Sequence, residues 1–131
     1  MKAKIISSAN FQPNTYLHTS SINHLHQNQG ENNLVYADLV LAAGEELDFH
    51  QHPNQTETFH LLTGELEVWI GHSKSKLKAG ETITIPAGIT HACFNTSKSE
   101  ARIFSILSSD IANLGFEFID QSSDYPWCSL R

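Results

Sequence analysis

Three histidines and one glutamate have the types and the spacing to hold a metal ion. His50 and His52 are separated by a single residue, and Glu57 follows shortly after them. His91 lies in a second segment, just after the turn sequence Pro86-Ala87-Gly88. Imidazole nitrogens and carboxylate oxygens are common ligands of divalent transition metals. The four side chains could therefore share one ion, provided that the elements carrying them converge.

Strand periodicity supplies that convergence. Side chains alternate between the two faces of a β-strand, so His50 and His52 point the same way. The residues Pro53-Asn54-Gln55 are typical of a turn that ends this strand and begins another, which carries Glu57. A third strand, begun after the Pro-Ala-Gly turn, carries His91 on one face with Ile89, Cys93 and Asn95. The sequence thus predicts three imidazoles and one carboxylate around one ion.

This ligand set suits a borderline divalent ion better than calcium or magnesium, which prefer mostly oxygen. Iron, manganese, nickel, copper, cobalt and zinc all fit, and the set does not distinguish among them. If the ion is six-coordinate, two positions remain for water, substrate or dioxygen, as catalysis requires. One divalent transition metal ion is the predicted cofactor.

The segments that carry these residues resemble the two signature motifs of the cupin family. All ten specified residues match at the family's spacing, in Gly44-EELDF-His50-Q-His52-PNQT-Glu57-TFHLLT-Gly64 and Gly80-ETITI-Pro86-A-Gly88-IT-His91-ACF-Asn95. The fifteen residues between the motifs make the chain similar to the compact single-domain microbial cupins of the type-2 conserved-barrel kind. The resemblance implies an all-β fold, a cupin-type double-stranded β-helix or jelly-roll-like antiparallel barrel, with the ion inside. It assigns the same four ligands, but it implies no reaction, since cupins include oxygenases, isomerases, decarboxylases, sugar-binding and storage proteins.

A chain of 131 residues is long enough for one domain with its own core. We expect a single cupin domain over 1–131, with the barrel at about 34–108, N-terminal strands within 1–33 and an aromatic C-terminal tail at 109–131. Alternating residues predict barrel strands at 34–41, 65–71 and 101–107; the apolar set of 65–71 is expected to face inward, and both faces of 34–41 are expected to be partly covered.

The two ends of the chain give weaker signals. Short strands are expected near 15–17 and 22–25, laid against the outside of the barrel, followed by a turn at 30–33. Ser109-Asp110 could begin a single helical turn that ends near Gly115. The aromatic residues of the tail must dock over the barrel wall, across a subunit boundary or at the mouth of the metal cavity.

Composition excludes some functions. Fourteen acidic against eight basic residues give a net charge of −6, without a Lys/Arg cluster that could bind a phosphate backbone, so no nucleic-acid partner is expected. Neither a signal peptide nor a membrane-spanning segment is apparent, which predicts a cytoplasmic protein without a membrane partner. Cys93 and Cys128 lack the spacing of a bridge or a zinc knuckle and are expected to be reduced.

Several other residues could do chemistry but lack partners. His24 and His26 form a second His-x-His without a carboxylate at useful spacing, so we expect exposed imidazoles on an edge strand. The isolated His18 and His72 are interpreted in the same way. Three lysines that recur with strand period predict a solvated stripe that discourages edge-to-edge association: Lys74, Lys76 and Lys78.

Two further residues are assigned to faces of their strands, Cys93 to the face of the metal ligands and Trp69 to the outer face. Cys93 shares the inward face of His91 and is interpreted as a small buried hydrophobe that could touch a ligand. Trp69 is expected on the outer face of its strand, where a large aromatic needs cover. Together with the aromatic tail and the two apolar faces of 34–41, Trp69 favours a homodimer.

The predicted function is binding of a small-molecule ligand or substrate beside the ion, in an oxygenase- or isomerase-like enzyme. No acid or base is assigned, because no further titratable residue is forced into the cavity by its spacing. The alternative is a non-catalytic module in which the metal fixes a small ligand or stabilises the barrel. Open coordination positions and a ligand-sized cavity would distinguish the two.

Overall fold

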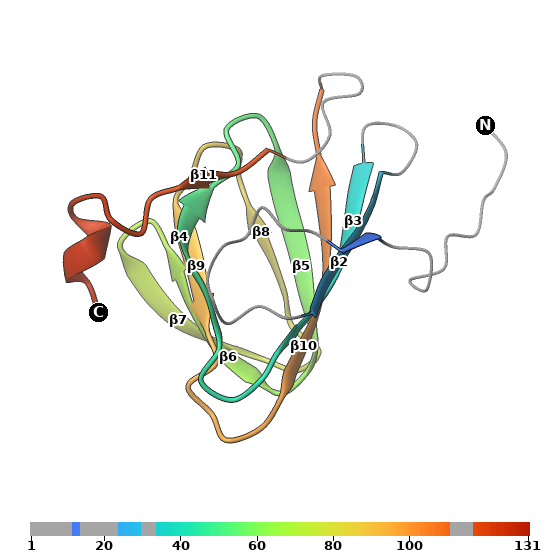
Figure 1. The fold of residues 1–131 in the computed structure, drawn as a ribbon, viewed down its shortest axis with the longest axis vertical. Coiled ribbons are helices and arrows are strands. Elements are labelled where there is room, and N and C mark those ends of the chain that lie inside the picture. Colours follow the sequence, from blue (N-terminus) through green and yellow to red (C-terminus); the bar gives the residue numbers. More distant parts are fainter. Residues whose placement is uncertain (1–11, 14–23, 30–33, 111–116) are drawn as a thin grey trace, which may run out of the picture.

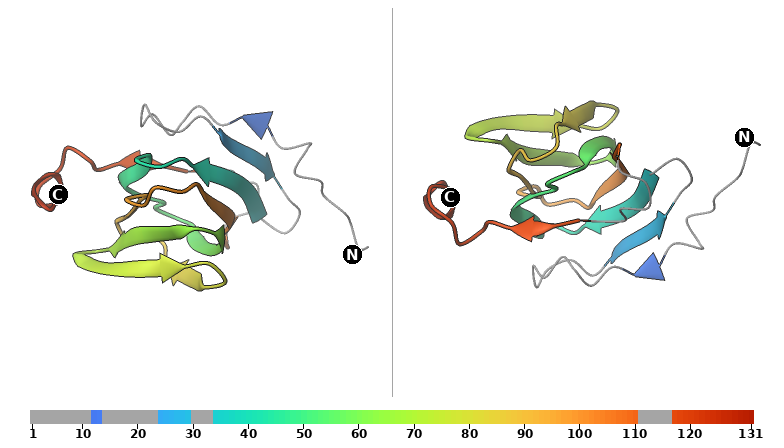
Figure 2. Two further views of the ribbon diagram at one scale, coloured as in Figure 1. Left: turned by 90° about the horizontal axis from the view of Figure 1, so that it is seen from below. Right: turned by 90° about the horizontal axis from the view of Figure 1, so that it is seen from above.

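The described chain is built of antiparallel β-strands in two sheets that face each other (Figures 1 and 2). The computed structural model describes residues 12–13, 24–29, 34–110 and 117–131, the first two ranges as backbone only. Its strands are β1 (Gln12–Pro13), β2 (His24–Gln29), β3 (Leu34–Leu41), β4 (Glu46–Gln51), β5 (Thr56–Thr63), β6 (Glu65–Ile70), β7 (Ser73–Lys78), β8 (Thr82–Ile85), β9 (His91–Phe94), β10 (Ala101–Ser108) and β11 (Ile119–Asp120). A short 3-10 helix, η2, spans Trp127–Ser129. Among these described residues, no helix has the length and apolar character needed to cross a lipid bilayer.

Successive strands alternate between the sheets. Sheet A has the order β1-β2-β3-β10-β5-β8, and sheet B has the order β11-β4-β9-β6-β7. From β3 to β6 each strand therefore lies in the opposite sheet from the one before, and the alternation resumes from β8 to β10. This winding makes a double-stranded β-helix, so the predicted fold class is confirmed. That the whole chain is one domain stays a prediction.

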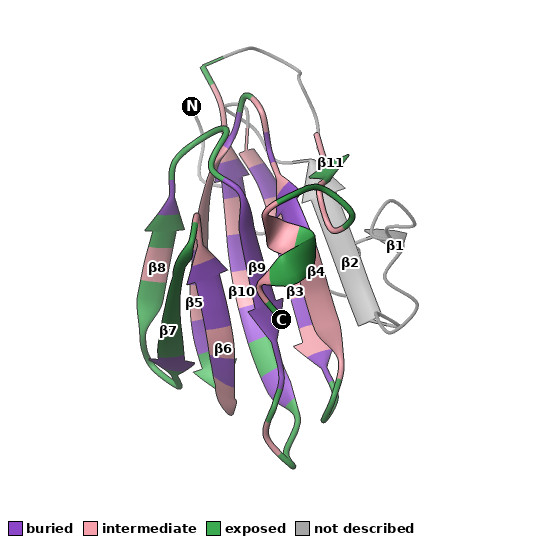
Figure 3. Ribbon diagram, turned by 90° about the vertical axis from the view of Figure 1, so that its left-hand side faces the viewer, coloured by how far each residue is buried: buried purple, intermediate pink, exposed green. Residues whose placement is uncertain are grey.

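The period-2 pattern of the sequence decides which face of each strand is buried. Every second side chain of β3 is buried, from Val35 to Leu41, and β10 repeats the pattern from Ala101 to Leu107 (Figure 3). Fully burying one such aliphatic side chain contributes about 1.5–3 kcal/mol. The inward rows of both sheets form one core of twelve buried residues: Ala37, Leu39, Leu41, Phe59, Leu61, Leu66, Val68, Leu77, Ile85, Cys93, Ala101 and Ile103.

Gly64 makes the sharp connection between β5 and β6. Its φ is +84°, and a Cβ at this position would lie 2.7 Å from the carbonyl oxygen of Glu100. Glycine is therefore required both by backbone conformation and by the close approach of the neighbouring chain. The turn sends β6 into sheet B directly after β5.

The N-terminal strands extend a sheet instead of lying against the outside of the barrel. β2 pairs with β3 along six residues, and β1 pairs with β2. β2 begins within the expected strand at 22–25 and runs further. The expected strand at 15–17 and the turn at 30–33 lie outside the described residues, as does most of the helical turn expected between Ser109 and Gly115.

Trp69 lies on the outer face of sheet B, as predicted, but its cover comes from the same chain. It is only 8% exposed and meets Phe49 edge-on, with ring centroids 5.9 Å apart. The outer aromatic cluster comprises Phe49, Trp69, Ala92 and Phe94, with Trp127 and Leu130 of the tail packed against it. Trp69 therefore gives no argument for a second subunit, and the homodimer stays a prediction.

Candidate metal centre

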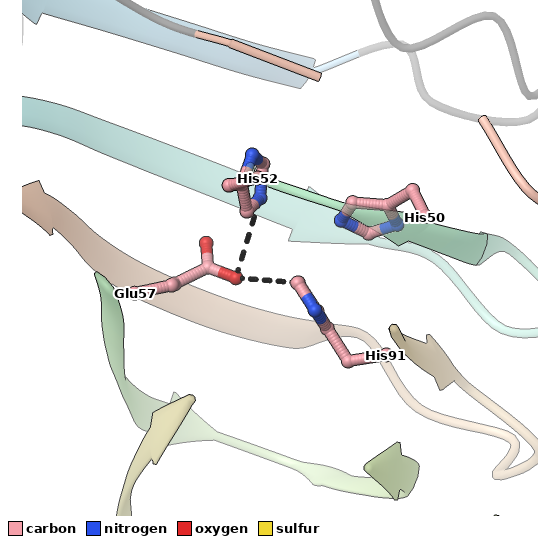
Figure 4. A group of neighbouring side chains, drawn as sticks. All are labelled: His50, His52, Glu57 and His91. Carbon is pink, nitrogen blue, oxygen red and sulfur yellow. Dashed lines mark ion pairs between the residues drawn. The ribbon is translucent and has the colours of Figure 1, made fainter. Parts of the chain in front are cut away.

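The structure brings together the four side chains that the sequence singles out. One ligand atom from each of His50, His52, Glu57 and His91 lies within 4.8 Å of the others (Figure 4). β4 and β9 pair so that His50 stands opposite His91, with ring centroids 4.3 Å apart. Glu57 comes from β5 in the facing sheet. Two sheets thus contribute to one potential metal-binding site.

Each imidazole is oriented by a backbone carbonyl. Nδ1 of His50 donates to the carbonyl oxygen of Asp48 at 2.6 Å, and Nδ1 of His91 donates to that of Ile89 at 2.8 Å. Nδ1 of His52 donates to the carbonyl oxygen of Glu117 at 2.5 Å. Because a carbonyl only accepts, Nδ1 is the protonated nitrogen in all three rings. Nε2 of each neutral ring is left with a lone pair, the state that a metal requires.

Glu57 is held by a hydroxyl on one oxygen and faces the histidines with the other. Ser105 on β10 donates its hydroxyl to Oε2 at 2.7 Å. Oε1 lies 3.0 Å from Nε2 of His91 and 3.7 Å from Nε2 of His52. The carboxylate therefore presents one oxygen to the space between the rings.

The pKa values of these groups follow from burial and from one another. Burial alone would raise the pKa of Glu57, but the imidazoles of His52 and His91 outweigh it and hold that pKa well below its usual range. Burial, followed by the neighbouring His91 and His52, holds the pKa of His50 well below its ordinary value. Burial would also lower the pKa of His52, but Glu57 and the Glu117 carbonyl outweigh it and raise that pKa. The site therefore keeps its carboxylate ionised and His50 neutral.

A cation between these groups would satisfy an atom that otherwise has no partner. Nε2 of His91 is buried and makes no hydrogen bond within the described part of the chain. With Nδ1 protonated, its lone pair faces a carboxylate oxygen 3.0 Å away, so two acceptors confront each other. Leaving a buried polar atom unsatisfied costs about 1–3 kcal/mol. The residues present therefore fit a divalent ion.

The side chains enclose a small cavity with apolar walls. Its volume is about 30 Å³, room for about two water-sized groups. It is lined by the four candidate ligands together with Ala37, Leu39, Leu47, Phe59, Ala92, Cys93, Ile103, Ser105 and Leu107. The space is much smaller than the few hundred cubic ångströms typical of ligand pockets. A molecule bound there beside an ion would have few atoms.

Cys93 lines this cavity, as its shared face with His91 predicts. Burial, with a contribution from Glu57, raises the pKa of its thiol far above the ordinary value. It is therefore a neutral, apolar wall residue and not a thiolate ligand. Both Cys93 and Cys128 are free.

The turn before β9 ties the second motif to the first. Gly88 has a φ of +79°, which favours glycine, and its N–H donates to the carbonyl oxygen of His52 at 2.9 Å. β9 begins at His91, and Ile89 is 38% exposed instead of sharing the buried face. Asn95 fastens the loop after β9 by donating to the carbonyls of Leu41 and Ser99. Its role is structural.

The two other histidines whose side chains are described, His60 and His72, do not join the cluster. His72 meets the ring of Trp127, and Nδ1 of His60 pairs with the hydroxyl of Thr82. His24 and His26 belong to β2, but their side chains lie outside the description, and His18 lies outside it altogether. Among the described residues, the only cluster of three or more histidine, cysteine or acidic side chains placed to hold a metal consists of the four predicted residues.

Comparison with known proteins assigns the family. Residues 37–107, more than half of the chain, match the Cupin domain. The chain belongs to the cupin family. A germin-like protein of Arabidopsis thaliana, subfamily 2 member 2, is 37% identical over 67 residues, which cover 47% of this cupin and 31% of the relative. Oxalate oxidase 1 of Hordeum vulgare is 36% identical over 78 residues, covering 53% of this cupin and 38% of the relative.

A solved structure of oxalate oxidase is also similar. It superposes with a TM-score of 0.66 at 26% identity, covering 80% of this cupin and 59% of that chain. This cupin spans only about a third of the length of the curated relatives that it matches.

The sequence did not identify four residues that position the ligands of this cupin. Ser105 shares one face of its predicted strand with Ile103 and Leu107, but nothing in the sequence marks it as a partner of Glu57. Phe118 was recognised only as one aromatic of the tail. Glu117 acts through its backbone, which leaves no trace in residue type, and Gln55 looked like an ordinary turn residue.

Proposed function

We propose that this cupin binds one divalent transition metal ion through His50, His52, Glu57 and His91 and acts on a very small molecule beside it, in an oxygenase- or isomerase-like reaction. The proposal rests on one observation. Three Nε2 atoms and one carboxylate oxygen converge on one buried space. Each imidazole is already fixed in the tautomer that coordination needs. Positioning of this kind reduces the reorganisation that binding requires.

The ion would supply Lewis-acid or redox chemistry at this place. Four protein ligands leave open positions on an ion that takes more than four. Glu57 contributes the single negative charge, and Ser105 keeps its carboxylate from rotating. The apolar lining formed by residues such as Phe59 and Leu39 excludes bulk water from the reacting groups.

The cavity restricts the substrate. Its volume of about 30 Å³ favours a compact molecule with few non-hydrogen atoms. No lysine, arginine or amide side chain is among its lining residues, so an anionic substrate would find its positive partner only at the ion. The similarity to proteins named oxalate oxidase supports small carboxylates as the first class to test, with oxalate among them.

The same lining supports the second candidate, a non-catalytic module that binds a small ligand through its metal. Apart from the four candidate ligands, Cys93 is the only titratable side chain among the described residues that line the cavity. With its pKa raised far above the ordinary value, that thiol is a poor acid or base at neutral pH. Any proton transfer would depend on the ligands or on the bound molecule itself.

Metal analysis combined with oxygen uptake tests the proposal. Protein purified without chelator or affinity resin should contain about one transition metal ion per chain, while His91→Ala purified in parallel should not. The loaded protein is then screened against small carboxylates, including oxalate, and against phenols, thiols and keto acids. Metal-dependent turnover of one compound that is absent in His91→Ala supports the enzyme. Stoichiometric metal with binding but no turnover favours the module, and absence of metal after reconstitution contradicts both.

A further inference from the structure

A short stretch near the C-terminus contacts two histidines of the candidate metal centre directly and the third through a neighbouring residue. We define the C-terminal strap as residues 117–121, which contain β11. The strap crosses beside β4 at the edge of sheet B (Figure 1), where Ile119 pairs with Gln51 and Asp120 pairs with His50. It lies outside both signature motifs.

The first contact of the strap is with His52. The carbonyl oxygen of Glu117 accepts the Nδ1 hydrogen of this ring at 2.5 Å, across a separation of 65 positions in the sequence. The other two histidines use carbonyls only two residues away on their own segments, those of Asp48 and Ile89. The orientation of His52 therefore depends on a distant part of the chain.

The strap also contacts the other two histidines, directly or through a neighbour. The ring of Phe118 stacks on His50, with centroids 4.8 Å apart and planes inclined by 25°. The side-chain oxygen of Gln121 accepts from the hydroxyl of Thr90, the residue before His91, at 2.5 Å. One segment thus contacts two of the imidazoles directly and the residue before the third.

The first motif contains the groups that hold the strap in place. The amide oxygen of Gln55, which is 1% exposed, accepts the backbone N–H of Glu117 at 2.9 Å. The amide of Asn54 donates to the carboxylate of Glu117 at 2.9 Å. At the other end, the backbone N–H of Gln121 donates to the carbonyl of Phe49 at 2.8 Å. Burying an amide such as Gln55 is costly unless its hydrogen bonds are made, so this contact specifies where the strap lies.

We propose that the strap is part of the metal centre, with Phe118 and the Glu117 carbonyl as positioning groups for His50 and His52, and that strap docking and ion binding are thermodynamically coupled. The inference rests on the proposed function, because it requires an ion at the four ligands. An undocked strap removes a stacking partner from one ligand and a carbonyl acceptor from another. Coupling between two equilibria is reciprocal, so the ion must also stabilise the docked strap.

Phe118→Ala tests the positioning role, with Tyr125→Ala as its matched control. Both changes delete an aromatic ring from the tail, but Tyr125 is 83% exposed and lies outside the strap. Calorimetric titration of the chelator-treated proteins with Co²⁺ should show weaker binding for Phe118→Ala by about 10- to 100-fold, the range found when groups that orient metal ligands are removed. Tyr125→Ala should match the wild type.

Spectroscopy separates positioning from simple loss of stability. The visible absorption bands of bound Co²⁺ report ligand geometry, and we expect them to shift in Phe118→Ala and to return in Phe118→Tyr, which keeps a flat ring. A loss of affinity with unchanged bands and no rescue by Phe118→Tyr would overturn the role of the ring. Equal Co²⁺ affinity in Phe118→Ala and wild type would overturn it as well.

Hydrogen exchange tests the coupling in the unaltered protein, so the inference does not depend on a variant that folds. Addition of Co²⁺ should slow exchange of the Glu117 and Gln121 amides, while the Cys128 amide, which donates to Asp124, should change much less. No metal-dependent protection in the strap would overturn the coupling even where Co²⁺ binds. If the wild-type protein binds no ion at all, the proposed function itself fails, which is a distinct result.

Discussion

The two faces of β4 show how one strand serves two different purposes. On the inner face, His50 points into the candidate metal centre, where its Nδ1 has an assigned hydrogen-bond acceptor. On the outer face, its neighbour Phe49 packs edge-on against Trp69 and Phe94 with ring centroids 5.9 and 5.8 Å apart. The interactions at the inner face are polar and depend on direction, whereas those at the outer face are apolar. Alternation along a strand thus keeps the groups that could do chemistry apart from those that stabilise the sheet.

The C-terminal residues complete both faces. The strap contacts the imidazoles of His50 and His52, and the segment that follows covers the outer aromatic cluster with Trp127 and Leu130. Arg131 fastens that end, with its guanidinium 3.7 Å above the ring of Phe94 and its Nε donating to Glu67 at 2.7 Å. The inner and outer faces of sheet B differ in composition, but the C-terminal residues 117–131 contact both.

The largest expected effect comes from the outer face. Trp69→Ala should lower the free energy of unfolding by about 3–5 kcal/mol, because it removes a buried ring and leaves a cavity. Metal affinity of the folded protein should change less than in Phe118→Ala, since no contact of Trp69 with a ligand imidazole is described. Urea unfolding in the presence of a chelator and titration with Co²⁺ measure the two quantities. A loss of affinity as large as that of Phe118→Ala would show that the two faces are not separable.

Metal binding should stabilise the protein through the inner face alone. Free ion at 100 times its dissociation constant adds about 2.7 kcal/mol to the free energy of unfolding, because it binds only the folded state. Trp69→Ala should gain the same amount, since distant sites contribute additively. Thermal melts of both proteins with Co²⁺ and with chelator provide the comparison. No metal-dependent shift in the wild type would exclude an ion that binds only the folded protein.

Acid should remove this stabilisation. Coordination needs neutral imidazoles, so protons compete with the ion as the pH falls. His52 has a raised pKa, so this competition begins above the ordinary histidine value of about 6.5. Affinity for Co²⁺ should fall by at least about tenfold from pH 7.5 to pH 5.5, because the neutral fraction of an imidazole falls about tenfold for each pH unit below its pKa. Titrations at the two pH values measure this, and equal affinities would argue against histidine ligation.

The sequence predicted the inner face well because its signal is local. Strand parity places His50 with His52, and a turn at Gly88 places His91, so the candidate ligands follow from nearby residues. The carbonyls that orient His50 and His91 also lie within two residues of them. The inward row of β6 is confirmed for the same reason, and β3 and β10 show the alternation that the sequence predicts, since alternation reports burial directly.

The parts that were missed depend on contacts between distant segments. Trp127 and Leu130 pack against the aromatic cluster that contains Trp69, and periodicity could identify the need for cover but not its source. The Glu117 contact uses a backbone atom, and the size of the cavity depends on how side chains of two sheets interdigitate. A ligand-sized cavity was the criterion for distinguishing an enzyme from a non-catalytic module, and only the structure could evaluate it.

The central claim is that His50, His52, Glu57 and His91 form one site for a divalent ion. Calorimetric titration of chelator-treated protein with Co²⁺ tests it most directly, using wild type, His91→Ala and the double variant His24→Ala/His26→Ala. We expect about one ion per chain in wild type, the same affinity in the double variant and loss of tight binding in His91→Ala. Equal affinity in His91→Ala and wild type, or loss of binding only in the double variant, would contradict it.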